Sequence, residues 1–293
     1  MINTFDKAQS ISCLQGAIWE GKIVMGYKYE THLHTSEASL CGSSTGAELA
    51  RFYKEQGYQG LVVTDHFFNG NTAVDRSLPW EEKVALYCRG YESAKEEGDK
   101  IGLDVFFGVE WAFHGDEFLL YGVSKEWLLA HPDMLGWSHK QLFEEIEKIG
   151  GLMIQAHPFR DRGYIGIIHL YPELVHGIEV TNTGNAPMDD RLADVYAKYW
   201  NLPVTSGSDT HRVGLPGRGI RGVVSEERWV DITSYANQVK NHTGYEIIST
   251  EDAVGIQPED RIHKAVDMFD REEKDITERL HKILPESVFL PEE

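Results

Sequence analysis

The sequence contains histidines and carboxylates in a pattern that suits metal binding. His32 and His34 alternate around one leucine in "THLHT". In an extended chain a spacing of two residues places both imidazoles on the same side. Imidazole and carboxylate groups together bind divalent transition metals such as manganese, iron and zinc. A lone His-x-His is usually accidental, so the rest of the sequence must decide whether this pair binds an ion.

Further groups of the same kind follow short apolar segments. His66 ends "GLVVTDH", Glu110 ends "VFFGVE" and His157 ends "LMIQAH". Asp209 and His211 follow "LPVTSGS". Each group stands at or just after the carboxyl end of an expected strand, and in a parallel α/β barrel these ends share the face where active sites form. We therefore expect these groups to converge, and the combination favours a metal site.

The elements that must position these groups alternate along the chain. Six segments are short and β-rich enough to be strands: 60–66, 104–111, 117–123, 151–158, 176–182 and 202–211. Segments 44–57 and 138–151 have helical apolar spacing, and each begins with a capping box, Thr45 with Glu48 and Ser138 with Gln141. The alternation predicts βα units around a largely parallel sheet, and about seven such units can close into a barrel.

The composition changes near residue 250. Segment 259–284 is highly charged and carries apolar residues at steps of three and four, which predicts a helix. We expect residues 1–250 to form the barrel and residues 251–293 a helical extension. That helix packs on the barrel or forms a subunit contact in a homo-oligomer.

Charge and cysteine content exclude several classes of protein. The chain has 28 Lys and Arg against 47 Asp and Glu, a net charge of -19, so we expect no long nucleic acid as partner. The three cysteines, Cys13, Cys41 and Cys88, match neither a disulfide framework nor a zinc motif. The sequence shows neither a signal peptide nor an apolar span, which predicts a cytoplasmic protein without membrane contact.

The ordered motifs resemble those of the polymerase and histidinol phosphatase family, the PHP family. They are "HLH", the acid Glu37, "TDH", "GVE", "AHP" and "GSDTH", within residues 28–225. The resemblance implies a distorted (β/α)7 barrel that binds two or three divalent ions (Mn, Fe or Zn) and hydrolyses phosphate esters. The resemblance also implies that Glu110 bridges two of the ions. The metal ligands that it implies are His32, His34, Glu37, His66, Glu110, His157, Asp209 and His211.

The chain departs from the family pattern at one position. Many members have a histidine just before a strand similar to "LLYG", whereas this chain has "GDEFLLYG" with Glu117 there. A carboxylate still binds Mn, Fe or Zn, although it changes the charge of the site. Asp116 and Glu117 are adjacent in an extended segment, so only one of them can face the site, and we expect it to be Glu117.

Catalysis and substrate binding are expected to use groups close to these motifs. We expect Glu110, His157 and Arg160 to act in catalysis, and Arg160, Arg218 and Asn182 to bind the substrate. Guanidinium groups suit phosphate oxygens, although these arginines can also be surface charges paired with acids. Asp65 either orients a histidine or ends a strand, and the role of His176 stays open.

Three functions remain compatible with the sequence. The first is a phosphoesterase for a small monoester such as a nucleotide, a nucleoside bisphosphate or a histidinol-phosphate-like compound. The second is a phosphotyrosine phosphatase or an exonuclease. The third is a regulatory protein that binds metal without catalysis. No G-x-S-x-G elbow or cysteine nucleophile signature is present, which favours attack by a metal-activated water.

Overall fold

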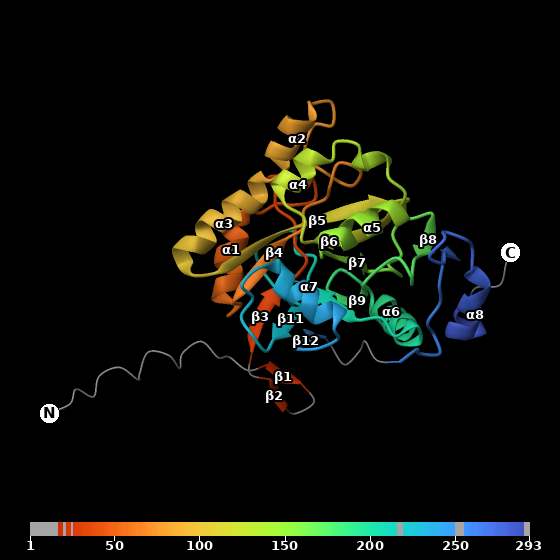
Figure 1. The fold of residues 1–293 in the computed structure, drawn as a ribbon. Coiled ribbons are helices and arrows are strands. Elements are labelled where there is room, and N and C mark those ends of the chain that lie inside the picture. The colour runs from red at the N-terminus through yellow and green to blue at the C-terminus, as the bar shows by residue number, and fades with distance from the viewer. Residues whose placement is uncertain (1–16, 20–21, 25, 216–218, 250–254, 290–293) are drawn as a thin grey trace.

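The computed structural model describes residues 17–19, 22–24, 26–215, 219–249 and 255–289. Its centre is a nine-stranded sheet with strand order β10-β9-β7-β6-β5-β4-β3-β11-β12 (Figure 1). The nine strands are β3 (Tyr27–Glu30), β4 (Gly60–Val63), β5 (Asp104–Phe113), β6 (Asp116–Tyr121), β7 (Leu152–Ala156), β9 (Gly177–Asn182), β10 (Val204–Gly207), β11 (Gly222–Ser225) and β12 (Tyr245–Ile248). They include all six strands that the sequence predicts.

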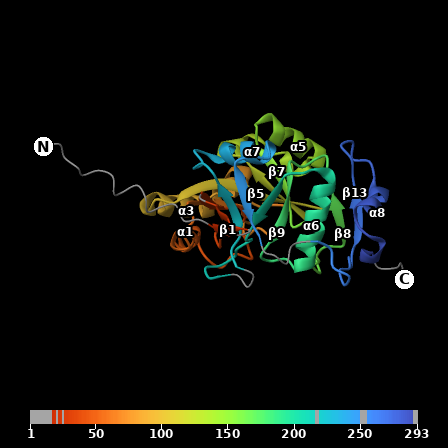
Figure 2. The ribbon, with the colours of Figure 1, turned by 90° about the horizontal axis from the view of Figure 1, so that it is seen from below.

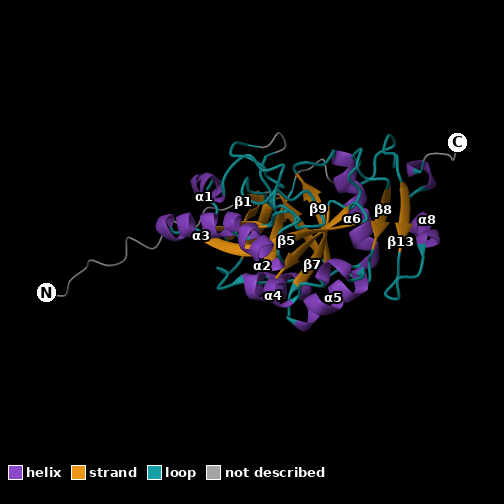
Figure 3. Ribbon diagram, turned by 90° about the horizontal axis from the view of Figure 1, so that it is seen from above, coloured by secondary structure: helices purple, strands orange, loops and turns teal. Residues whose placement is uncertain are grey.

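The sheet curves into a nearly closed barrel. Ser206 in β10 donates to the carbonyl of Ile248 in β12 at 2.7 Å, so the two edge strands meet. Helices surround the strands, as Figure 3 shows. They are α1 (Gly46–Glu55), α2 (Trp80–Tyr87), α3 (Arg89–Ile101), α4 (Lys125–Ala130), α5 (His139–Lys148), α6 (Pro187–Trp200) and α7 (Ile232–Lys240). The predicted distorted α/β barrel is therefore confirmed. Among the described residues, none of the helices is long and apolar enough to cross a membrane.

Both predicted capping boxes are present. Thr45 and Glu48 exchange hydrogen bonds at the start of α1, and Ser138 and Gln141 do so at the start of α5. The first turn of a helix leaves backbone N–H groups without partners, and these side chains satisfy two of them. The short local patterns therefore set where both helices begin.

The sheet is less parallel than the sequence analysis expects. Strand β6 runs antiparallel to both β5 and β7, and β11 runs antiparallel to β3 and β12. A tight turn around Gly115, with φ of 100°, joins β5 to β6. Because a hairpin needs no crossover helix, alternation of strands and helices cannot reveal it. The start of β6 therefore lies at the same edge as the ends of β5 and β7.

The prediction of one long helix in segment 259–284 is wrong. Strand β13 (Ala265–Met268) pairs in parallel with β8 (Ile167–Leu170), and only the short α8 (Leu280–Ile283) is an α-helix in this segment. Val266 and Met268 alternate into the main core, which is the period of a strand. Asp270 accepts from the backbone of Glu272 and Lys274, so the charged run forms a turn.

The C-terminal segment packs beside α6, outside the barrel (Figure 2). The buried pair of Arg191 on α6 and Asp260 attaches it there, and Leu280 and Ile283 belong to the main core. In the described residues this segment therefore contacts α6 and the main core, and a separate extension or a subunit contact stays a prediction. A boundary at residue 250 stays a prediction, because residues 250–254 lie outside the described part of the chain.

Candidate metal centre

The His-x-His segment lies just beyond the end of β3 in extended conformation. Its backbone is held between two neighbours: Leu33 N–H donates to Thr64 at 3.0 Å, and His34 N–H donates to the carbonyl of Thr210 at 2.9 Å. Leu33 is buried in the core on one side, whereas His32 and His34 are buried on the other. The two Nε2 atoms are 3.3 Å apart, which agrees with the expectation that both imidazoles share one side.

Glu110, in β5, lies at the centre of four imidazoles. Its Oε1 is 3.1 Å from His32 Nε2 and 3.4 Å from His157 Nε2. Its Oε2 is 2.7 Å from His66 Nδ1 and 3.4 Å from His34 Nε2. The structure thus brings together, around one carboxylate, groups that are far apart in the sequence.

Asp209 and His211 complete the other side of the cluster. Asp209 Oδ1 is 3.0 Å from His34 Nε2 and 3.6 Å from both His32 and His211. The backbone φ is 53° at Asp209 and 32° at His157, values that are unfavourable for residues with a side chain. Such strain is typical of functional sites, where the surrounding structure maintains it.

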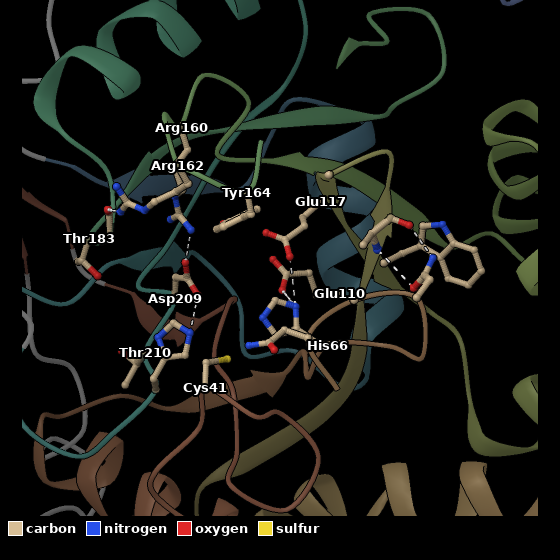
Figure 4. Close-up of a pocket in the computed structure, with 18 of the residues that line it drawn as sticks. Cys41, His66, Glu110, Glu117, Arg160, Arg162, Tyr164, Thr183, Asp209 and Thr210 are labelled. Atoms are coloured by element: carbon tan, nitrogen blue, oxygen red, sulfur yellow. Dashed lines mark hydrogen bonds and ion pairs between the residues drawn. The ribbon is translucent and has the colours of Figure 1, made fainter. Parts of the chain in front are cut away.

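Glu117 also lies in the cluster (Figure 4). Its Oε1 is 3.3 Å from His66 Nδ1, and its Oε2 is 3.6 Å from His157 Nε2. Asp116 instead accepts from the ring and backbone of His169 at 2.7 and 3.0 Å. The adjacent acids therefore point in different directions, and Glu117 is the one that faces the site.

Glu37 is not brought to the cluster. Both of its carboxylate oxygens accept from the backbone N–H of Gly46, at 3.1 and 3.2 Å. Gly46 is the first residue of α1, and the start of a helix attracts negative charge. The structure therefore places Glu37 as a partner of the helix, in contrast to the ligand role that the resemblance implies.

Buried atoms in the cluster lack hydrogen bonds. His66 Nδ1, both carboxylate oxygens of Glu110 and His157 Nε2 are buried without a hydrogen-bond partner. The separation of 2.7 Å between His66 and Glu110 is short enough for a hydrogen bond, but the direction is not suitable. Unsatisfied buried polar atoms cost free energy, and divalent ions would satisfy them.

Several groups of three side chains have ligand atoms within 4.8 Å of one another. They combine imidazole and carboxylate ligands, so the residues fit divalent transition metals. The sets without sulfur are His32 with His157 and Asp209, His32 with His34 and Glu110, His34 with Asp209 and His211, and His66 with Glu110 and Glu117.

Burial and neighbouring charges together set the protonation states of the cluster. Burial by itself would raise the pKa of Glu110, but the imidazoles of His66 and His32 hold it well below the usual range. Burial similarly would raise the pKa of Asp209, which Arg160 and His32 lower instead. Burial lowers the pKa of His34 to about 3, and the charge of His66 contributes. These ionised carboxylates and the neutral His34 ring are forms that bind cations. Burial by itself would lower the pKa of His32 and His66, but the neighbouring carboxylates raise both, so an ion must displace a proton from each of these rings.

Two carboxylates orient histidines of the cluster from outside it. Glu179, on β9, lies 3.0 Å from His32 Nδ1 and leaves Nε2 directed toward Glu110. Asp65 accepts from Ser39 Oγ at 2.7 Å, and Ser39 Oγ lies 3.4 Å from His34 Nδ1. Such partners fix the tautomer and orientation of metal-binding histidines. Asp65 thus acts on His34 through Ser39, a contact that adjacency in sequence does not reveal.

Arg160 is buried at the edge of the cluster. It donates to Asp209 Oδ2 and Asn182 Oδ1 at 2.7 Å each, and to Asn185 Oδ1 at 2.8 Å. A guanidinium has five N–H groups, so about two remain for another acceptor. Asn182 also donates to Glu179 at 2.9 Å. Arg218 lies outside the described residues.

The cluster opens into a cavity of about 1440 Å³. Cys41, which the sequence analysis did not assign to the site, lines this cavity close to His66 (Figure 4). Burial would raise the pKa of the Cys41 thiol, but hydrogen bonds with His211 and His66 lower it to about 7. His176 lies elsewhere: it accepts from the backbone of Met153 and contacts Glu147, which is a packing role.

Three solved structures share much of this architecture, although no family model and no curated protein matches the chain. A two-domain protein from Bacteroides vulgatus, containing a predicted PHP-like metal-dependent phosphoesterase, has 19% identity and a TM-score of 0.57, over 83% of this chain and 69% of its own. PsfC from Pseudomonas syringae has 17% identity and a TM-score of 0.50, over 78% and 93%. The lesion-specific endonuclease PfuEndoQ from Pyrococcus furiosus has 13% identity and a TM-score of 0.49, over 76% and 58%. The first two of these structures show that the chain has the distorted barrel fold of PHP-like proteins, as its motifs predict.

Proposed function

We propose that the protein is a metal-dependent phosphoesterase that hydrolyses a small phosphate monoester. The observation that carries this proposal is Glu110, a buried carboxylate among four imidazoles. Both of its oxygens, and the facing nitrogens of His66 and His157, lack hydrogen bonds. The fold shared with a PHP-like phosphoesterase supports the same conclusion. His32, His34, His66, Glu110, Glu117, His157, Asp209 and His211 would hold the ions.

When bound, divalent ions supply Lewis acidity and a water of lowered pKa for attack on phosphorus. The chain's own residues position the ester. The remaining N–H groups of Arg160 can donate to phosphate oxygens, while its bonds to Asn182 and Asn185 fix the guanidinium plane. Glu179 keeps the His32 ring in place, so that the ligand atoms converge before substrate arrives.

The rim of the cavity supports a small substrate with an apolar or ring-shaped body. Leu135, Tyr164, Val213 and Leu215 all line the cavity and are exposed large hydrophobic residues. Exposed apolar groups gathered at one opening are typical of a binding site. The net charge of -19 disfavours a long polyanion, and we therefore prefer a monoester to an oligonucleotide.

A phosphate-release screen tests the proposal. The metal-free protein is loaded with Mn, Fe(II) or Zn and assayed for phosphate release from monoesters, nucleotides and a phosphotyrosine peptide. Oligonucleotides are assayed for strand cleavage by gel electrophoresis, because hydrolysis of a phosphodiester releases no inorganic phosphate. We expect metal-dependent release from a small monoester. A preference for the peptide or the oligonucleotides would support the alternative enzymes instead, and no hydrolysis of any substrate would contradict an enzymatic role.

A matched pair of variants shows whether the cluster is responsible for the hydrolysis. Glu110→Gln keeps the size of the side chain but removes the charge between the imidazoles, so it should abolish turnover. His281→Ala removes an exposed histidine outside the cluster and should leave turnover unchanged. Equal activity of Glu110→Gln and the unmodified protein would refute the assignment.

A further inference from the structure

The loop that carries Cys41 is held rigidly beside the metal centre. Leu40 N–H donates to the carbonyl of Asn71 at 2.9 Å, and Ser43 N–H donates to the carbonyl of His211 at 2.7 Å. Gly42 has no space for a side chain, because a Cβ there would lie 2.3 Å from the carbonyl oxygen of Thr35. Bonds on both sides of Cys41 therefore fix its backbone without the help of its thiol.

The thiol shares its surroundings with ligands of the cluster. The sulfur of Cys41 and a ring nitrogen of both His34 and His66 lie within 4.8 Å of one another. His66 is itself buried, and its Nδ1 has no hydrogen-bond partner. This unsatisfied atom is an observation independent of the cysteine, and it indicates a ligand that the His66 ring would bind.

We propose that the Cys41 thiolate is a ligand of the ion that His66 binds. The inference rests on the proposed function, since it adds one ligand to the same metal centre. Cys41 takes the role that the sequence resemblance gives to Glu37, whose carboxylate binds the start of α1. Binding releases the thiol proton, because only the thiolate coordinates.

A sulfur ligand changes which metal ion this part of the centre binds most tightly. Thiolates favour softer ions such as zinc, whereas carboxylates favour manganese. Cys41 groups with His34 and His66, and Glu117 groups with His66 and Glu110, so both kinds of side chain lie near His66. We expect zinc, Fe(II) or cobalt to bind this position more tightly than manganese, and the bound ion to protect the thiol from alkylation and oxidation.

Cobalt(II) titration of the metal-free protein tests the inference without substrate. A thiolate bound to cobalt gives an intense near-ultraviolet charge-transfer absorption that nitrogen and oxygen ligands do not give. We expect this absorption in the unmodified protein and its loss in Cys41→Ser, with at least about tenfold weaker affinity for one ion. Cys88→Ser is the matched control, because Cys88 is also a free cysteine but is buried in the core, and this variant should retain the absorption.

A second measurement needs no variant. Bound zinc should protect one thiol of the unmodified protein from a thiol-reactive dye, and removal of zinc with a chelator should restore the reaction. Cobalt binding without the charge-transfer absorption, or an absorption that persists in Cys41→Ser, would refute the Cys41 assignment but leave the proposed function intact. Failure to bind any cobalt, zinc or manganese would refute both.

Discussion

Replacement of Arg160 by alanine is expected to destabilise the metal-free protein by about 3–5 kcal/mol, the cost of removing one partner of a buried ion pair. The guanidinium is buried and donates to Asp209, Asn182 and Asn185 at 2.7–2.8 Å. The bond to the carboxylate contributes roughly 1.5–3 kcal/mol and each bond to an amide roughly 0.5–1.5 kcal/mol. The sum of the three bonds, about 2.5–6 kcal/mol, includes this range.

Urea unfolding in the presence of a chelator, followed by circular dichroism, measures this loss. Arg228→Ala is the matched control, because Arg228 is 56% exposed and pairs with Asp104 at the surface. A surface pair contributes about 0–1 kcal/mol, so the control should be nearly neutral. A loss below about 1 kcal/mol for Arg160→Ala would refute the buried-pair reasoning.

The pH dependence of the unfolding free energy gives a second test of the pair of Arg160 and Asp209. In the unmodified protein the pKa of Asp209 is held well below its ordinary value of 3.8. An acid with a depressed folded-state pKa stabilises the protein above its unfolded-state pKa and loses that contribution as the pH falls. Arg160→Ala should raise the pKa of Asp209, so the stability of the variant should depend less on pH below about 4. An unchanged acid profile would contradict this electrostatic account.

Four further outcomes are expected. The double variant of His32→Ala and His34→Ala should lose at least one ion by elemental analysis, together with hydrolysis, while its circular dichroism stays the same; full activity would refute the site. Glu117→Gln, loaded with Mn, should hold about one ion fewer per chain, and identical metal content would exclude Glu117 as a ligand. Arg160→Ala should weaken inhibition by inorganic phosphate by about 1.5–3 kcal/mol at unchanged metal content, and unaltered inhibition would exclude Arg160 from phosphate binding. Burial lowers the pKa of His139 from 6.5 to about 3, so the unfolded state gains the proton first and stability should fall as the pH drops below 6.5. Urea unfolding at pH 7 and 5 should show about 2 kcal/mol more loss in the unmodified protein than in His139→Gln.

The sequence by itself determined the local elements and most of the cluster. Capping boxes are short patterns, so Thr45 and Ser138 mark where helices begin without reference to the rest of the chain. The site followed from a rule of topology, because ends of parallel strands share one face. His66, Glu110 and His157 could therefore be grouped before any distance was known.

The tertiary structure decided what depends on partners far away in the sequence. Glu37 binds Gly46 and Cys41 lies beside His66 because backbone bonds to Asn71 and His211 set the course of their loop. The pairing of β13 with β8 replaced a predicted helix, since an apolar spacing that suits a helix can also be satisfied by a strand once a partner is available. Glu179 meets His32 across 147 residues. Packing of the whole barrel sets such contacts, and the spacing of residues along the chain does not predict them.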